Sequence, residues 1–358
     1  SSQNTDAASA GDGSSSHGGD AAIGAGVAIT YVDVQNHSLV PATLVVHAHA
    51  LTVRATQTID GTDDTSTVSA VASSGAGGGK VSVAGSVALG LVWFDTLAAV
   101  RGAVVLTGGD AVIAAGSALA TTVNALATGD GVTATGDAGV GVSFALALVT
   151  HDTHALLADQ ITLAGARDLT LAASGVSRTA ARAQMGAKGG DVTVTPSIAI
   201  IVSNVRTTAV VGALTAVPIA VSRNVTISAT QTTEARTTAD ASATGGSDAA
   251  VGVAIALTFA FDTVTATTRR SIVAGGWVSL SALGSSRNGA DAKASAAGAP
   301  GEDSADAPSG NVDQQVGAQR SYADTTSKSQ GGDGVQNGAT PSASSSDGGV
   351  SVAGAIAL

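Results

Sequence analysis

The stretch that decides the fold is KVSVAGSVALGLVWFDTLAAV, residues 80–100. It alternates with a period of two and is rich in β-branched residues, which is typical of a β-strand. Similar phrases return further along the chain, as GVGVSFALALVTHDTHALL from Gly139 and DVTVTPSIAIIVSNVRTTAVV from Asp191. Self-similarity of this kind predicts a repeat protein whose units stack on their neighbours.

The apolar phrases set the expected divisions of the chain. They begin at Ile23, Val81, Val140, Val192, Val251 and Val350, at intervals of 58, 59, 52, 59 and 99 residues. The first four intervals indicate a unit of roughly 60 residues or slightly fewer, and the fifth indicates a unit with an insertion. We expect a slice of a longer array, divided into the end of a preceding repeat (1–22), five repeats (23–80, 81–139, 140–191, 192–250 and 251–284), a Gly/Ser/Ala/Asp-rich insertion (285–349) and the start of a further repeat (350–358).

Each unit has the same internal order of strand and turn signals. A second alternating segment follows the apolar phrase, and a short clause such as LTV from Leu51 or LTL from Leu169 opens a third. Gly, Asp and Asn separate the segments, as they do between strands. The pattern predicts an all-β fold, a repetitive β-solenoid. If each unit comprises two or three coils, the chain should form a rod on the order of 60–90 Å long. The alternative is a stack of antiparallel β-hairpins.

Composition favours thin layers over one thick core. Aromatic residues are 2% of the 358 residues, and there are 46 glycines and a single methionine. Few large side chains are therefore present to fill a deep interior. Disorder does not fit either, because 44% of the residues are hydrophobic.

Charge and hydropathy exclude several classes of partner. The formal net charge is −11, and no basic patch stands out, so we expect no nucleic-acid partner. The longest apolar runs, such as 251–261, are far shorter than the roughly 20 residues of a membrane-spanning helix, so we expect no membrane insertion. Cysteine is absent, which excludes disulfides and thiolate metal sites.

The phrase VSVAGSVALGLVWFDT from Val81, followed by a short alternating strand, resembles repeat modules of very large bacterial filamentous surface adhesins, both haemagglutinin-like and leukotoxin-like. In those modules an Asn or Asp followed by Thr comes after a Val/Ala/Gly strand. The chain departs from this pattern at Asp33-Val34, at Asn204-Val205 and in the insertion. The resemblance implies a β-solenoid, export to the bacterial cell surface, and a role in adhesion or as a stalk.

One Asp or Asn closes the apolar phrase in each of the five repeats. A short acceptor side chain can bond backbone N–H groups two residues on and so bend the chain. We therefore predict a column of structural turns at the corners of the stacked units, made by Asp33, Asp95, Asp152, Asn204 and Asp262.

Two clusters offer weak candidates for metal ligands. His47 and His49 point to the same face of a strand, as zinc or nickel ligands would, but no third ligand can be named. Asp60, Asp63 and Asp64 lie in an acidic loop of the kind that binds calcium, without EF-hand or RTX spacing. A solvent-facing pair and a solvated turn are the favoured interpretations, so we predict no metal site and no cofactor, with calcium the one candidate.

No catalytic signature emerges, and we predict that the chain is not an enzyme. The leading hypothesis is a non-catalytic structural or adhesive segment of a long extracellular fibre on the bacterial surface. Its expected partners are further repeats, neighbouring fibre subunits, and a host or cell-surface glycan or protein.

Two alternatives come from other functional classes. An ice- or crystal-surface binder would use the hydroxyl groups of Thr52, Thr170, Thr226 and Ser279, although Val112 interrupts that array. A carbohydrate-active β-helix enzyme would need a cluster of basic and acidic residues, whereas the 16 Lys and Arg residues are scattered. Thermal hysteresis would support the first alternative, and glycan depolymerisation the second.

Overall fold

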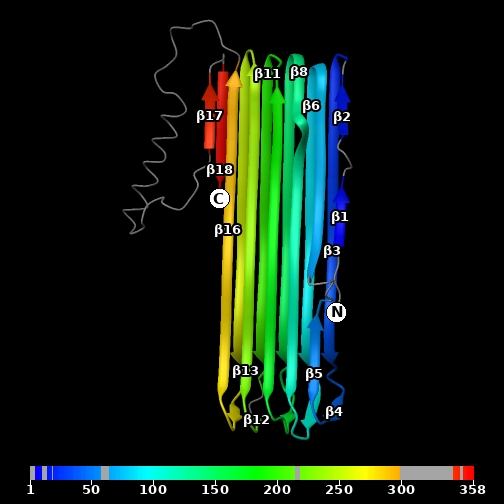
Figure 1. Cartoon of the computed structure of the whole chain (residues 1–358), viewed down its shortest axis with the longest axis vertical. Coiled ribbons are helices and arrows are strands. Elements are labelled where there is room, and N and C mark those ends of the chain that lie inside the picture. Colours follow the sequence, from blue (N-terminus) through cyan, green and yellow to red (C-terminus); the bar gives the residue numbers. More distant parts are fainter. Residues whose placement is uncertain are drawn as a thin grey trace, which may run out of the picture.

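A computed structural model describes residues 5–9, 14–17, 19–57, 64–213, 218–298, 342–346 and 350–358. The described residues form strands and turns without an α-helix, so the prediction of an all-β fold is confirmed. One 13-stranded sheet wraps into a nearly closed, barrel-like shape, and two small sheets lie beside it. Figure 1 shows the long strands running side by side along the longest axis of the molecule.

The main sheet forms two layers. Layer 1 contains β3 (Ala21–Val40), β11 (Val192–Val211), β14 (Ala249–Thr268) and β18 (Val350–Ala357). Layer 2 contains β5 (Leu51–Thr56), β10 (Leu169–Lys188), β13 (Val225–Gly246) and β16 (Val278–Gly298), with the short strands β1 (Thr5–Ser9), β2 (Ser14–His17) and β17 (Ser342–Ser346).

Two very long strands join the layers. The first parts of β6 (Thr65–Val100) and β8 (Ala111–Leu157) lie in layer 2, and their last parts, 81–100 and 138–157, lie in layer 1. At one end of the molecule, short strands close the turn between the layers. They are β4 (Val45–Ala48), β7 (Ala103–Leu106) and β9 (Leu163–Ala164) in one small sheet, and β12 (Ile219–Val221) and β15 (Ile272–Ala274) in the other.

All strand pairs in the described part of the chain are parallel, which the antiparallel-hairpin alternative does not allow. In layer 1, Ala21 pairs with Val81, which pairs with Ala138, then Val192 and Ala249. Each step to the next partner advances along the chain by about one interval between apolar phrases. This pairing is compatible with a β-solenoid. The expectation of two or three coils per unit is wrong, because one passage through both layers uses the whole interval.

Small side chains fill the space between the layers. The central core cluster consists of alanines together with Val123 and Ile201. A Cβ added to Gly26 would collide with the backbone oxygen of Ser73 in the opposite layer, and one at Gly252 would collide with that of Ser295. The two sheets therefore approach closely along this part of the molecule, as a core of small residues permits.

Larger apolar side chains gather near the end closed by the short strands. Ile113, Leu157, Leu169, Leu171 and Ile227 are fully buried there. They pack in one buried cluster with residues of the short strands, through which the chain turns from layer 1 into layer 2.

The predicted insertion begins too early. Residues 285–298 continue β16 and pair with β13, so the predicted insertion at 285–349 starts inside a strand, and Ser342–Ser346 within it form β17 beside β16. Ala292, Ala294 and Ala296 alternate inward within a polar sequence, and this alternation supports the strand. Residues 299–341 lie outside the described part.

Candidate functional site

The outer side of layer 1 is strongly apolar, although it faces away from the core. This holds over the first half of the long strands, where outward positions carry mainly Val, Ile, Leu, Phe and Tyr and the inward positions between them mainly Ala, Ser, Gly and Thr. Beyond Tyr31 the outward positions turn polar, as at Asp33 and His37 on β3. Ile23 is 68% exposed and Tyr31 is 65% exposed on the edge strand β3. A sheet with one solvated side normally has the opposite arrangement, with polar residues outward.

We call this surface the apolar field and define it by five rows of outward residues that the strand register aligns across layer 1. The rows are Ile23, Val83, Val140, Val194, Val251 and Val352; Ala25, Gly85, Val142, Pro196, Val253 and Gly354; Val27, Val87, Phe144, Ile198, Ile255 and Ile356; Ile29, Leu89, Leu146, Ile200 and Leu257; and Tyr31, Leu91, Leu148, Val202 and Phe259. No charged residue lies within these rows.

The outer side of layer 2 has the opposite character. Its outward positions on β10, β13 and β16 are rich in Ser, Thr, Ala, Arg and Asp. Ion pairs are found on it, such as the 3.1 Å contact between Arg236 and Asp291. The molecule therefore presents a polar outer face on layer 2 and a large apolar area on the outer side of layer 1.

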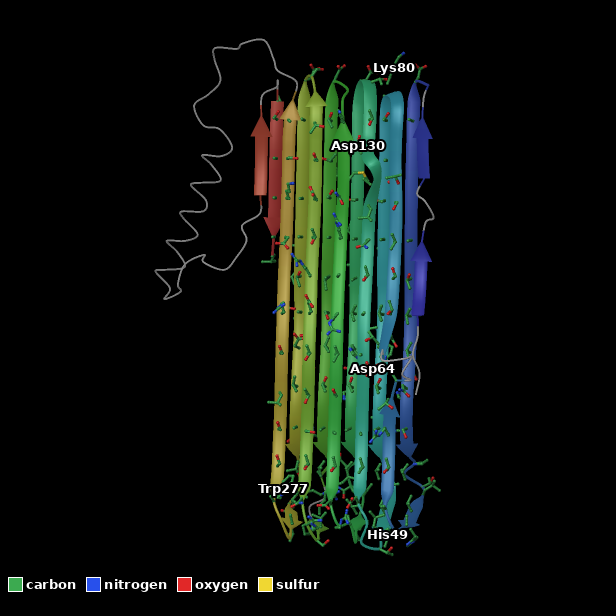
Figure 2. All side chains as sticks on the ribbon, in the orientation of Figure 1. His49, Asp64, Lys80, Asp130 and Trp277 are labelled. Atoms are coloured by element: carbon green, nitrogen blue, oxygen red, sulfur yellow. The ribbon has the colours of Figure 1, made fainter. Side chains whose placement is uncertain are left out.

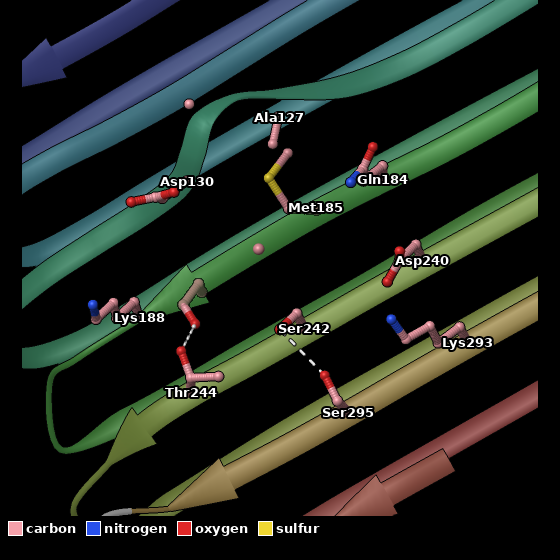
Figure 3. Close-up of a pocket in the computed structure, with 13 residues that line it drawn as sticks. Ala127, Asp130, Gln184, Met185, Lys188, Asp240, Ser242, Thr244, Lys293 and Ser295 are labelled. Atoms are coloured by element: carbon pink, nitrogen blue, oxygen red, sulfur yellow. Dashed lines mark hydrogen bonds between the residues drawn. The ribbon is translucent and has the colours of Figure 1, made fainter. Parts of the chain in front are cut away.

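A bulge in β8 forms a shallow groove on the polar face. On β10, Ala183 pairs with Ala125 and Ala187 pairs with Val132, so β8 holds three extra residues there. Gly129 and Gly131 adopt positive φ angles of 60° and 85°, which let the chain leave and rejoin the sheet. The bulge bounds a groove of about 410 Å³ (Figure 3).

Four charged residues line the groove together with hydroxyl groups. Figure 3 shows Asp130 and Lys188 toward one side of it and Asp240 and Lys293 toward the other. Donors and acceptors spaced along an open surface can bind a polar ligand such as a sugar through hydrogen bonds. The lining contains no His and no Cys, which are common nucleophiles or bases in hydrolytic sites.

The interior holds a polar cluster that the sequence did not indicate. His151 Nε2 lies 2.7 Å from Ser117 Oγ, which lies 2.6 Å from Thr153 Oγ1. The His151 ring packs edge-on against Phe94, with ring centroids 5.5 Å apart. Burial lowers the pKa of His151 to about 4, so the ring is neutral at pH 7. The Ser–His pair is closed off from solvent and cannot meet a substrate.

The predicted column of turns is wrong. Asp33, Asp95, Asp152, Asn204 and Asp262 all lie inside strands rather than at corners, and they do not share one row. Where they have partners in the described part, these are side chains. His37 lies 2.7 Å from Asp95, His154 lies 3.9 Å from Asp152, and Thr233 and Ser286 donate to Asp262.

A genuine column of Asp and Asn lies at the other corner, where the chain enters layer 2. The backbone N–H of Asn224 donates to Asp168 Oδ1 at 2.9 Å, and that of Trp277 donates to Asn224 Oδ1 at 3.2 Å. Arg167 bridges Asp168 and Asp110. Hydrogen bonding from Asn224 is the main reason that the pKa of Asp168 is lowered. In the sequence, Asp110, Asp168 and Asn224 each stand directly before the clause that opens the third segment of their unit. That position is the signal from which this column could have been predicted.

The candidate metal ligands do not come together. Figure 2 places His49 at the end of the molecule with the short strands, far from Asp64 along the strands. His49 Nδ1 lies 3.2 Å from the carbonyl oxygen of Thr107, and His47 is exposed. Asp60 and Asp63 lie outside the described residues. Within the described ranges, no group of three or more His, Cys, Asp or Glu residues is arranged to hold a metal ion.

The hydroxyl residues of the ice-binding alternative do form one row. Thr52 and Thr170 both pair with Val112, Thr170 pairs with Thr226, and Thr226 pairs with Ser279. The next outward row carries Arg54, Ala114, Ala172, Ser228 and Ser281, so the regular array of hydroxyl groups is one row wide.

Comparisons with known proteins add no relative. No protein-family model matches the chain, and the searches of curated proteins and of solved structures find no match either. Among the described residues, no helix has the length and hydropathy needed to cross a membrane.

Proposed function

We propose that the chain is a non-catalytic structural and adhesive segment of a long extracellular fibre on a bacterial surface. In this proposal the chain is a solenoid whose repeating unit, of roughly 60 residues or slightly fewer, forms one passage through both layers. Further units of the same kind stack on its open edges and are its principal partners.

The outer edge of β3 is the observation that carries the proposal. Among the described strands, β3 forms its ladder with β6 alone, and the part of its outer edge from Gly26 to Val40 pairs with no described strand. Soluble proteins protect such an edge with lysine, proline or a bulge, because it templates further pairing. Residues 21–40 contain neither lysine nor proline, and the ladder to β6 has no register shift. An edge of this kind suits continued stacking.

The polar face supplies the adhesive part of the proposal. Its groove offers carboxylates, ammonium groups and hydroxyls on an open surface, which suits a host or cell-surface glycan or protein. Because the face follows the stack, the same type of surface recurs along a fibre, and weak contacts add up through multivalency.

Two measurements test the proposal. A chain carrying two copies of residues 21–298 in tandem should form one stack in small-angle scattering, longer along the stacking direction by about 4.8 Å per added passage. Two independently tumbling bodies would contradict stacking. Beads coated with the chain should adhere to cells or to a glycan array, whereas release of sugar fragments from polysaccharides would favour the enzyme alternative.

The ice-binding alternative keeps one supporting observation, the aligned row of Thr52, Thr170, Thr226 and Ser279. Thermal hysteresis that disappears on replacing Thr170 and Thr226 by Lys would establish it in place of the fibre.

A further inference from the structure

The apolar field is as large as a protein–protein interface. Five rows of outward residues on six strands span roughly 25–30 Å in each direction, or about 800 Å², at the usual spacings of a β-sheet. A stable complex buries about 800 Å² on each partner, and an ordinary monomer rarely exposes an apolar patch of that size. The area therefore suffices for one specific interface.

The chemistry of the field favours another sheet over a lipid surface. No bulge interrupts the field, because the strands of layer 1 pair without a register shift between its rows. Two such sheets pack face to face at about 10 Å with interdigitated side chains. Asp33 lies in the row after Tyr31, and Asp95 and Asp152 lie together with Arg206 in the row after that. This acidic excess and the net charge of −11 both oppose contact with an anionic membrane.

The border of the field carries an aromatic pair suited to anchor a partner. The rings of Tyr31 and Trp93 lie 5.3 Å apart between centroids and are tilted by 41°. Tyr31 is 65% exposed and Trp93 is 40% exposed. Tyrosine and tryptophan dominate the binding energy of many interfaces, because they bury a large area with few rotatable bonds.

We propose that the apolar field binds the apolar field of a second copy of this chain, face to face about a two-fold axis. A surface that contacts itself needs no second complementary patch, and closed two-fold dimers are the commonest assemblies. This inference goes beyond the fibre proposal, because it uses the face of layer 1 and not the edge of β3. In a fibre it would pair two stacks side by side.

Analytical ultracentrifugation of the whole chain tests the proposal. The wild-type chain should dimerise, and Leu146→Lys with Ile200→Lys should weaken the dimer at least about 100-fold, because each chain would bury two charges without partners. The matched control is Thr170→Lys with Ser228→Lys on the outer side of layer 2, which should leave the dimer unchanged. Far-ultraviolet circular dichroism checks that all the chains fold.

A second measurement avoids added charge. The chain has no cysteine, so Ile200→Cys and Ser228→Cys each introduce a single thiol. Alkylation of the thiol at position 200 should slow as the protein concentration rises, while that at position 228 should keep its rate.

Three results would overturn the proposal. The first is a wild-type chain that stays monomeric at all concentrations, whether or not it also binds neutral phosphatidylcholine vesicles. The second is a dimer unaffected by the layer 1 lysines. The third is protection of position 200 that does not depend on concentration, which would mean that the same chain covers the field. None of these results bears on stacking at the β3 edge.

Discussion

Acid should destabilise the fold through His151. The ring is fully buried between the layers, and burial lowers its pKa from 6.5 to about 4. Between these pH values the unfolded chain binds a proton that the folded chain does not, so the free energy of unfolding falls as the pH falls. The difference corresponds to about 3 kcal/mol in all, at about 1.4 kcal/mol per pH unit. Above pH 6.5 and below pH 4, the contribution of His151 to the free energy of unfolding should not change with pH.

The assay is urea unfolding of the whole chain at pH 7, 6, 5 and 4, compared with His151→Gln. Glutamine keeps a polar group opposite Ser117 but does not titrate, so the loss of stability between pH 6.5 and 4 should shrink by about 3 kcal/mol in the variant. His47→Gln, at an exposed position, is the matched control and should follow the wild type.

Neighbouring groups also titrate in this region. Burial raises the pKa of Asp152, which favours the folded state as the pH falls, whereas burial lowers the pKa of His154, which acts in the same direction as His151. Both groups remain in the His151→Gln variant, so the difference between the two curves isolates His151. Parallel curves, or a nuclear magnetic resonance titration of His151 near pH 6.5, would refute the reasoning.

Other substitutions test the corner, the close approach of the layers and the bulge. Asp168→Ala should lower the midpoint of urea unfolding through the lost backbone hydrogen bond, and Asp168→Asn should lower it much less, whereas an equal effect of Asp33→Ala would contradict the corner role. Gly252→Val should destabilise the fold by at least about 1–3 kcal/mol, because its side chain would meet the backbone of the opposite layer. The control Gly289→Val, where no atom lies within 4 Å of an added Cβ, should cost less in the same assay. Deleting residues 128–130 should close the groove and retain the far-ultraviolet β signal, and loss of that signal would show that the bulge is needed for folding.

The sequence by itself determined the all-β class and the positions of most strands. Period-2 alternation over long runs is a local property, and the phrases from Val81 and Val192 begin where the structure starts to pair those residues in layer 1. The scarcity of large side chains likewise indicated thin layers, and the central cluster of alanines agrees with this. The strand over 285–298 escaped the prediction because its outward residues are mostly polar and its only buried side chains are Ala292, Ala294 and Ala296.

The tertiary structure decided which side of each strand faces the core and which Asp or Asn marks a corner. Both sides of a strand such as 81–100 are apolar enough for burial, so alternation alone could not choose between them. The close approach of the layers at Gly26 and Gly252 leaves room only for small side chains, and the large ones therefore face outward. In the same way, Asp95 and Asp168 are both short acceptors, but only Asp168 lies where the next passage of the chain directs a backbone N–H at it. That alignment depends on contacts between residues more than 50 positions apart, which a local pattern does not contain.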